Sequence, residues 1–243
     1  MEASTTLIAS AYERLRADVL SGHWAPGQKL GIEGLRDHYA TGATPVREAL
    51  NRLAAEGWVQ HLDQRGFAVA PVSDEALREL AQTRVWVETL ALTQAMLRKT
   101  ADWEEQVVLA LHRLSKTARS LSVDRYEENP EWERLHRAFH MVLVGHCGSR
   151  WLTGFCEQLY DQAYRYRQLA VKAAYKRRNE LAEHRAVADA VVAGDVTRAC
   201  VALTDHYDKT ARIILDSGAR AALMRLPTQS ALPGSGYSTK VMP

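Results

Sequence analysis

The first seventy residues contain three stripes of apolar residues at the three- and four-residue spacing of amphipathic helices. The first stripe, Ile8–Val19, stops near a glycine, and the second covers Ile32–Tyr39. The third covers Val46–Ala54. After it the pattern changes, because residues 58–62 and 67–70 are short β-prone runs separated by a turn sequence. Three helices followed by a β-hairpin are typical of a winged helix-turn-helix.

The start of the third helix is the candidate DNA-reading element. We expect the Thr44 hydroxyl to cap this helix and Pro45 to occupy its first turn, where a missing N–H costs nothing. Arg47 and Asn51 then lie on the side opposite the apolar stripe. Arg47 could contact a guanine edge in the major groove. The alternative is that Arg47 is a solvated surface residue paired with Glu48.

From residue 73 to about 218 every periodic segment predicts a helix. Helix starts are expected at four polar capping residues, and a break separates the last two helices at Gly194. The capping residues are Ser73, Thr100, Asn129 and Ser149. The fold class is therefore mostly α, with a winged helix followed by an all-helical bundle of six to seven helices.

These patterns divide the chain into three parts. Residues 1–72 form the winged helix, residues 73–220 form the bundle, and residues 221–243 are expected to be a disordered tail, because proline, glycine and serine replace any periodicity. At 243 residues, with 47% apolar and 25% charged residues, the chain has the composition of a globular protein with two domains.

The composition restricts both the expected cellular location and the kinds of site that the protein can contain. No apolar run approaches the ~18 residues of a membrane span, and a secretory leader is not recognisable, so we expect a cytoplasmic protein with no membrane partner. The three cysteines, Cys147, Cys156 and Cys200, are isolated, which argues against a disulfide framework or a thiolate zinc site. Residues 1–72 carry seven basic and eight acidic side chains. DNA binding would therefore depend on a few well-placed arginines.

Four of the nine histidines are predicted to point into the helical bundle. His136 and His140 are four residues apart inside one apolar stripe, and His184 and His206 continue the stripes of two later helices. Such histidines are either hydrogen-bonded core residues or ligands that converge on a divalent cation. An all-imidazole site suits Zn²⁺, with Ni²⁺, Cu²⁺, Fe²⁺ or Mn²⁺ as alternatives, better than Mg²⁺ or Ca²⁺.

The front part closely resembles the winged helix of GntR-family regulators. The resemblance rests on the sequence P-V-R-E-A-L at residues 45–50, on Leu53 and Glu56-Gly57 after it, and on Pro26-Gly27 before it. It implies DNA contacts near the start of the third helix and at the tip of the wing. The candidate DNA-binding residues are Arg36, Thr44, Arg47, Asn51, Arg65 and Gly66. Two departures are Gly42-Ala43, where the family usually has Ser-Arg, and Glu33, where a basic residue is common.

The back part resembles the FCD-type ligand-sensing domain of the FadR subfamily. The matching segments are H-R-A-F-H at 136–140, E-H-R-A-V at 183–187 with Gly194-Asp195, and His206. The resemblance implies a metal set of His136, His140, His184 and His206, in which His136 replaces the usual Asp or Asn and so removes a negative charge. It also implies a small carboxylate effector held by arginine.

Three arginines are candidates for that carboxylate. Arg84 matches the arginine of the family, although an intrahelical ion pair with Glu88 is an equally simple interpretation. Arg165 and Arg167 are two residues apart, so only one of them can face the pocket. The bundle is most similar to the branch of the family that represses glutarate and 2-hydroxyglutarate catabolism.

Together the two halves predict a DNA-binding transcriptional regulator that responds to a ligand. The expected protein is a homodimeric repressor that reads a palindromic operator in double-stranded DNA and is not an enzyme. One alternative is a metal-dependent enzyme acting on a small carboxylate, although no H-E-x-x-H arrangement is present. The other is a metal-free dimerisation module whose histidines only pack.

Overall fold

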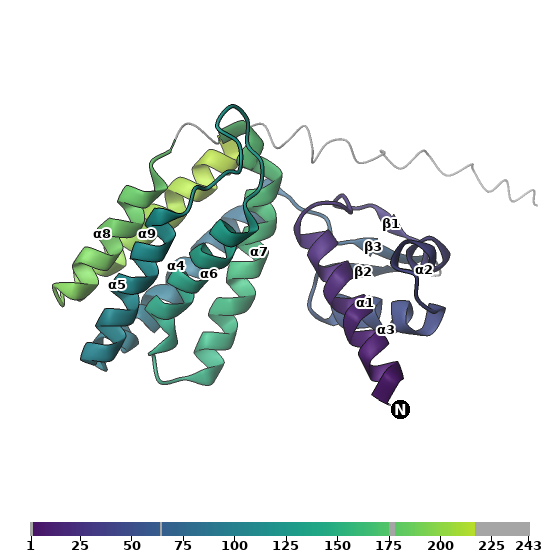
Figure 1. The fold of residues 1–243 in the computed structure, drawn as a ribbon, viewed down its shortest axis with the longest axis horizontal. Helices are drawn as coiled ribbons and strands as arrows, with labels where there is room; N and C mark the ends of the chain where they lie inside the picture. Colours follow the sequence, from purple (N-terminus) through teal and green to yellow (C-terminus); the bar gives the residue numbers. More distant parts are fainter. Residues whose placement is uncertain (1, 64, 175–177, 217–243) are drawn as a thin grey trace, which may run out of the picture.

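The computed structural model describes residues 2–63, 65–174 and 178–216, and the predicted tail at 221–243 lies outside these described residues. Within them the chain is mostly helical, as predicted. Helices α1–α3 and a small sheet form one part, and helices α4–α9 lie side by side as a bundle in the other (Figure 1). In the described residues no helix is long and apolar enough to cross a membrane.

The front part is a winged helix-turn-helix. Its helices are α1 (Glu2–Leu20), α2 (Ile32–Tyr39) and α3 (Ala43–Ala55). Its strands are β1 (Lys29–Leu30), β2 (Val59–Leu62) and β3 (Gly66–Val69). They form an antiparallel sheet of order β1-β3-β2, in which Val59 pairs with Val69 and Lys29 with Ala68. The hairpin was predicted, whereas the two-residue strand β1 was not, because two residues carry no detectable alternation.

The core of the front part contains the apolar stripes predicted from the sequence. Leu15, Leu35, Leu50 and Leu53 are almost completely buried and pack together with the inner side of the sheet. Gly66 begins β3 with φ near +89°, a backbone conformation that glycine adopts without steric cost, and this closes the wing.

The predicted cap of α3 was wrong. The N-cap is Gly42 in an extended conformation, and no side chain caps the helix. The carbonyl of Gly42 accepts the N–H of Val46 at 3.4 Å. Thr44 and Pro45 lie inside the first helical turn instead. Proline is tolerated there because the first-turn N–H groups have no partner within the helix. The helix therefore begins earlier than the Thr-Pro signal indicated.

The back part contains helices at the predicted positions. They are α4 (Asp74–Leu97), α5 (Ala101–Lys116), α6 (Pro130–Gly145), α7 (Arg150–Ala174), α8 (Glu180–Val192) and α9 (Val196–Asp216). Three of the predicted caps are confirmed, because the side chains of Ser73, Thr100 and Asn129 accept N–H groups at the starts of α4, α5 and α6. Ser149 also accepts the N–H of Leu152 at the start of α7. The core includes Leu92, Val107, Phe139, Leu143, Val191 and Leu203.

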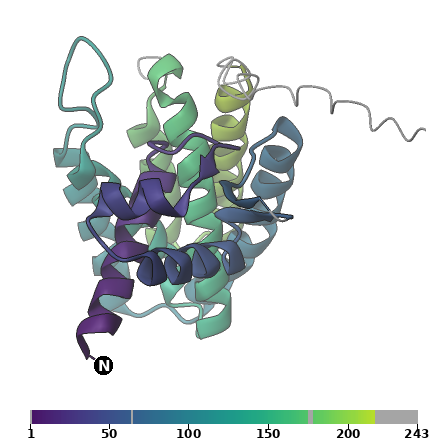
Figure 2. The same ribbon diagram turned by 90° about the vertical axis from the view of Figure 1, so that its right-hand side faces the viewer.

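Helix α7 lies at the side of the bundle that meets the winged helix (Figures 1 and 2). Asp161 on α7 forms an ion pair with Arg16 on α1. Tyr164, one turn later, packs against the core of the front part. The guanidinium of Arg165 donates to the carbonyl of Ala70 in the segment that joins the two parts. One face of α7 therefore carries polar contacts both to the winged helix and to the joining segment.

Candidate metal centre

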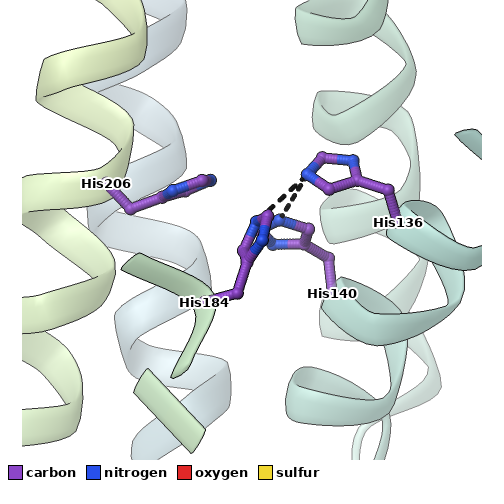
Figure 3. Close-up of side chains that lie close together, drawn as sticks. All are labelled: His136, His140, His184 and His206. Carbon is purple, nitrogen blue, oxygen red and sulfur yellow. Dashed lines mark hydrogen bonds between the residues drawn. The ribbon is translucent and has the colours of Figure 1, made fainter. Parts of the chain in front are cut away.

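Four histidines from three helices meet in the middle of the bundle. His136 and His140 come from α6, His184 from α8 and His206 from α9 (Figure 3). All four are buried, and each offers one ring nitrogen to a set whose members lie within 4.8 Å of one another. The convergence expected from the sequence is therefore present. It arises because each histidine continues the buried stripe of its own helix.

Two of the nitrogen-to-nitrogen distances are short. His136 Nε2 lies 3.2 Å from His184 Nε2 and also 3.2 Å from His140 Nε2. A ring nitrogen carries either one proton or one lone pair, so His136 Nε2 can form one good hydrogen bond but not both. Without a cation the cluster therefore leaves a buried nitrogen poorly satisfied, which is costly.

The histidines are held in their neutral form. Burial lowers the pKa of His136, His140 and His206 well below the ordinary value, and the neighbouring imidazoles and arginines lower it further. Burial likewise lowers the pKa of His184 to about 3. Neutral imidazoles keep a free lone pair at neutral pH, which is the form that binds a metal.

A second layer of side chains holds the outer nitrogens of three histidines. Tyr160 Oη lies 2.7 Å from His136 Nδ1, and Tyr207 Oη lies 3.2 Å from His140 Nδ1. A carboxylate oxygen of Glu183 lies 2.9 Å from His206 Nδ1. Such outer partners fix the ring orientation so that the other nitrogen points to the centre.

Two of the three predicted arginines lie beside this cluster. Arg167 Nη1 is 3.1 Å from His136 Nδ1, and Arg167 also pairs with Glu133 at 3.3 Å. Arg84 is buried and pairs with Glu88 at 2.6 Å, so the intrahelical ion pair exists. Its Nη2 atom is nevertheless buried with no hydrogen-bond partner, which leaves one donor for a ligand.

Arg165 lies elsewhere. Its guanidinium donates to Ala70, and burial lowers its pKa to about 10. Arg167, and not Arg165, is therefore the arginine beside the histidines. Residues two apart on a helix point to nearly opposite sides, so only one of the two could lie there.

The side chains of the second layer were not predicted from the sequence. Tyr160, Glu183, Arg178 and Tyr207 all contact the cluster or its immediate partners. Glu183 and Tyr207 are each adjacent in sequence to a metal candidate, and this adjacency was an available signal. Arg178 precedes α8 and donates to the His206 carbonyl at 3.0 Å, and no pattern marked it.

An open pocket of about 510 Å³ reaches the cluster beside His184. Arg119, Trp132 and Arg178 are among the residues that line it. Arg119 pairs with Glu180 at 2.9 Å, and Arg178 pairs with Glu183. The pocket therefore reaches the histidines at His184, and each of these two arginines is paired with a glutamate.

The candidate DNA-binding residues lie on the surface of the winged helix. Thr44 and Arg47 are exposed in the first half of α3, and Asn51 is exposed one turn after Arg47. Arg65 and Gly66 are exposed in the hairpin, and their neighbour at position 64 is outside the described residues. Arg36 is exposed at the end of α2 and pairs with Asp37 at 2.9 Å. Arg52, by contrast, pairs with Glu56 at 3.2 Å and covers the ring of Tyr12.

Comparisons with known proteins agree with this architecture. Residues 7–69 match the family described as bacterial regulatory proteins of the gntR family, and residues 79–209 match the FCD domain. The chain is 38% identical to the uncharacterized HTH-type transcriptional regulator BphR of Paraburkholderia xenovorans LB400, over 88% of this chain and 87% of the relative. It is 32% identical to the HTH-type transcriptional repressor GlaR of Escherichia coli K12, over 80% of this chain and 90% of the repressor.

Solved structures have the same fold. Escherichia coli McbR/YncC superposes with a TM-score of 0.69 at 21% identity, covering 86% of this chain and 97% of that one. A putative GntR regulator from Rhodococcus sp. RHA1 gives a TM-score of 0.67, covering 89% and 99%. BphR and GlaR are named transcriptional regulators and not enzymes. The chain belongs to the GntR family of bacterial DNA-binding transcriptional regulators, in the group with an FCD ligand-binding domain.

Proposed function

We propose that this regulator is a homodimeric repressor whose four-histidine cluster binds one divalent cation, with Zn²⁺ as the preferred ion. A small carboxylate effector then binds at the cation and weakens operator binding. The observation that carries the proposal is the convergence of four buried, neutral imidazoles from three helices on one point. The repressor role is supported by the relative GlaR, which is named a repressor.

The cluster fits a divalent cation. A tetrahedral cation with Zn–N bonds of ~2.0–2.1 Å places its ligand nitrogens about 3.3 Å apart. The 3.2 Å separations around His136 are close to this value. The four residues would hold the cation through ring nitrogens, and the cation would supply a Lewis acid. A carboxylate oxygen would have to join as a fifth ligand, which zinc accommodates by expanding from four to five coordination.

The surroundings favour an anionic effector. Histidine at position 136 makes all four ligands neutral, so the double positive charge of a bound cation is not reduced by its ligands. Arg84 and Arg167 add two more positive charges, although Glu88 and Glu133 partly compensate for them. The unpartnered Nη2 of Arg84 is a donor suited to a carboxylate oxygen.

Arg167 has a further part in this proposal. When His136 binds through Nε2, its remaining proton lies on Nδ1, which can donate to Tyr160 Oη. An arginine can only donate, so the contact between Arg167 Nη1 and His136 Nδ1 is then lost. The guanidinium becomes available to a carboxylate. Cation and effector are therefore expected to bind with positive coupling.

Helix α7 is the proposed connection to DNA binding. Tyr160 contacts the metal candidate His136, and the next residue, Asp161, pairs with Arg16 of the winged helix. One turn later Arg165 holds the joining segment at Ala70, while Arg167 contacts His136. A small shift of α7 on effector binding would move both sets of contacts, which is the requirement for coupling between two sites.

The winged helix supplies the DNA contacts. We assign base reading to Arg47, with Thr44 beside it, because both are exposed at the end of α3 that enters the major groove in this fold. Asn51 is assigned to the same surface because it is exposed one turn after Arg47. Arg65 and Gly66 in the wing, and Arg36 on α2, are assigned to backbone or minor-groove contacts.

Two copies are needed to read a palindrome, and the bundle offers an apolar surface for this purpose. A groove of about 410 Å³ lies between α4 and α9 and is lined by Leu90, Cys200 and Val201. Trp86 lies beside it with 65% of its surface exposed. In a two-fold arrangement each copy could insert Trp86 into the groove of its partner.

The direct test measures operator binding with and without effector. The full-length protein is loaded with Zn²⁺ or treated with a chelator, and its operator is first located by footprinting of the purified protein on genomic DNA. Its affinity for that operator is then followed across C4–C6 dicarboxylates, including glutarate and 2-hydroxyglutarate. The proposal predicts that one acid lowers the affinity of the zinc-loaded protein and has no effect after chelation. An identical response of both preparations would contradict it, and an unchanged melting temperature on chelation would favour the metal-free module.

A further inference from the structure

A second group of metal-ligating side chains lies in the winged helix, far in sequence from the buried cluster. It consists of Asp18 near the end of α1, His23 in the following turn and His38 in the last turn of α2. Each offers one ligand atom, and the three atoms lie within 4.8 Å of one another. We propose that these residues, the Asp18 triad, bind a divalent transition-metal cation independently of the four-histidine cluster.

The composition of the triad selects the class of cation. Two imidazoles and one carboxylate suit Zn²⁺, Ni²⁺ or Cu²⁺, whereas Mg²⁺ and Ca²⁺ prefer sites made of oxygen ligands. Three protein ligands leave at least one coordination position for water. The triad is therefore a site for a cation that stays in contact with solvent.

The carboxylate of the triad is held in position by a buried tyrosine and a partly buried tryptophan. Asp18 Oδ2 accepts the hydroxyl of Tyr39 at 2.6 Å, and the same hydroxyl accepts the indole N–H of Trp24 at 2.8 Å. Tyr39 is buried in the core of the winged helix. A hydrogen-bonded second layer of this kind orients a ligand before the cation arrives.

The distances require only small side-chain movements. His38 Nε2 lies 3.6 Å from Asp18 Oδ2, close to the separation of about 3.3 Å between two ligands of a tetrahedral cation. The His23 and His38 rings lie with their centroids 5.4 Å apart. Both histidines are exposed, so they can rotate to bring their nitrogens onto one centre.

Because the triad is exposed, we expect it to bind a cation more weakly than the buried four-histidine cluster does. The side chains of His38 and Asp18 are 42% and 30% exposed, so binding must order mobile groups and compete with water. The triad is therefore the weaker of two sites on the chain. Its cation would join the end of α1 to the end of α2, and both helices pack against the DNA-reading helix α3.

The experiment counts ions on the full-length protein. Ni²⁺ is titrated by calorimetry into the metal-free chain, and two classes of site with one ion each are expected. The double variant His23→Ala/His38→Ala should bind only the tighter ion. Asp18→Asn, which keeps an acceptor for Tyr39, should weaken the second site at least tenfold. His61→Ala, an exposed histidine of the wing, is the matched control and should keep both ions.

The outcomes separate this proposal from the proposed function. His140→Ala should lose the tighter ion and keep the weaker one, whereas loss of the weaker ion alone in the double variant supports the triad. A wild-type chain that binds a single ion, removed by His140→Ala, would overturn the triad and leave the buried site standing. A double variant that keeps both ions would also overturn it, and circular dichroism checks that each variant is folded.

Discussion

Replacing Tyr160 with phenylalanine tests the second layer of the metal centre with a minimal change. Tyr160 is 3% exposed, and its hydroxyl lies 2.7 Å from His136 Nδ1 and accepts from Arg167 Nη2 at 3.2 Å. The substitution removes this hydroxyl and keeps the ring, so no large cavity forms. Every other contact of the four histidines remains.

The expected loss of metal affinity follows from the proton on His136. When Nε2 binds the cation, Nδ1 must donate, and Tyr160 Oη is the acceptor in reach. Loss of such an outer partner typically lowers metal affinity ~10–100-fold, or about 1.4–2.7 kcal/mol. The metal-free protein loses the hydrogen bond to His136 and the charge-assisted one donated by Arg167, so its free energy of unfolding should fall by about 2–4 kcal/mol.

Competition with a chromophoric chelator measures the zinc affinity of the wild-type and variant proteins. Tyr166→Phe is the control, because Tyr166 is also a buried tyrosine of α7 but packs with Val72 and Ile214 away from the histidines. Zinc affinity should be unchanged in the control. Equal affinity in the wild type and in Tyr160→Phe would refute the assignment of Tyr160 to the metal centre.

Four further predictions follow from the same geometry. Arg47→Ala should cost ~1–3 kcal/mol of discrimination between operator and random DNA; equal losses on both DNAs in a binding titration would mark a phosphate contact instead. Asp161→Asn should reduce the effect of the effector on operator affinity without changing zinc affinity, whereas Glu157→Gln, an exposed charge on the same helix, should leave both unchanged. Trp86→Lys should shift the protein toward monomer in sedimentation velocity, and an intact dimer would exclude the α4–α9 groove as the interface. In urea titrations of the metal-free protein, the free energy of unfolding should fall as the pH drops below ~6.5. The histidines of the unfolded chain bind protons in this range, whereas the buried histidines of the folded protein have lowered pKa values and stay neutral. For His184 the free energy of unfolding continues to fall until about pH 3, and each such histidine contributes up to ~1.4 kcal/mol per pH unit. A free energy of unfolding that does not change with pH would contradict the lowered pKa values.

The sequence predicted the positions of the helices and the inward direction of the four histidines. It could do so because both depend on local periodicity: His136 and His140 are four residues apart on one stripe, and His184 and His206 each continue another. Side-chain caps were also readable, since Ser73, Thr100 and Asn129 act on N–H groups of their own helices.

Features that depend on tertiary contacts were not readable. Helix α3 begins after Gly42 rather than at Thr44, because the backbone conformation before a helix is set by the whole connection and not by the best capping residue. Strand β1 exists only because β3 pairs with it. Arg165 and Arg167 have different roles because Arg165 donates to the joining segment at Ala70, whereas Arg167 contacts His136. No local pattern distinguishes them.

The central claim is that one cation is shared by four imidazoles inside the bundle. X-ray absorption spectroscopy on protein loaded with one equivalent of zinc per chain tests it most directly. A four-imidazole site gives a first shell of nitrogen ligands at ~2.0–2.1 Å with the outer-shell scattering of several imidazoles, and His140→Ala should lose this signature. A shell containing sulfur, or one made only of water and carboxylate oxygen, would contradict the claim.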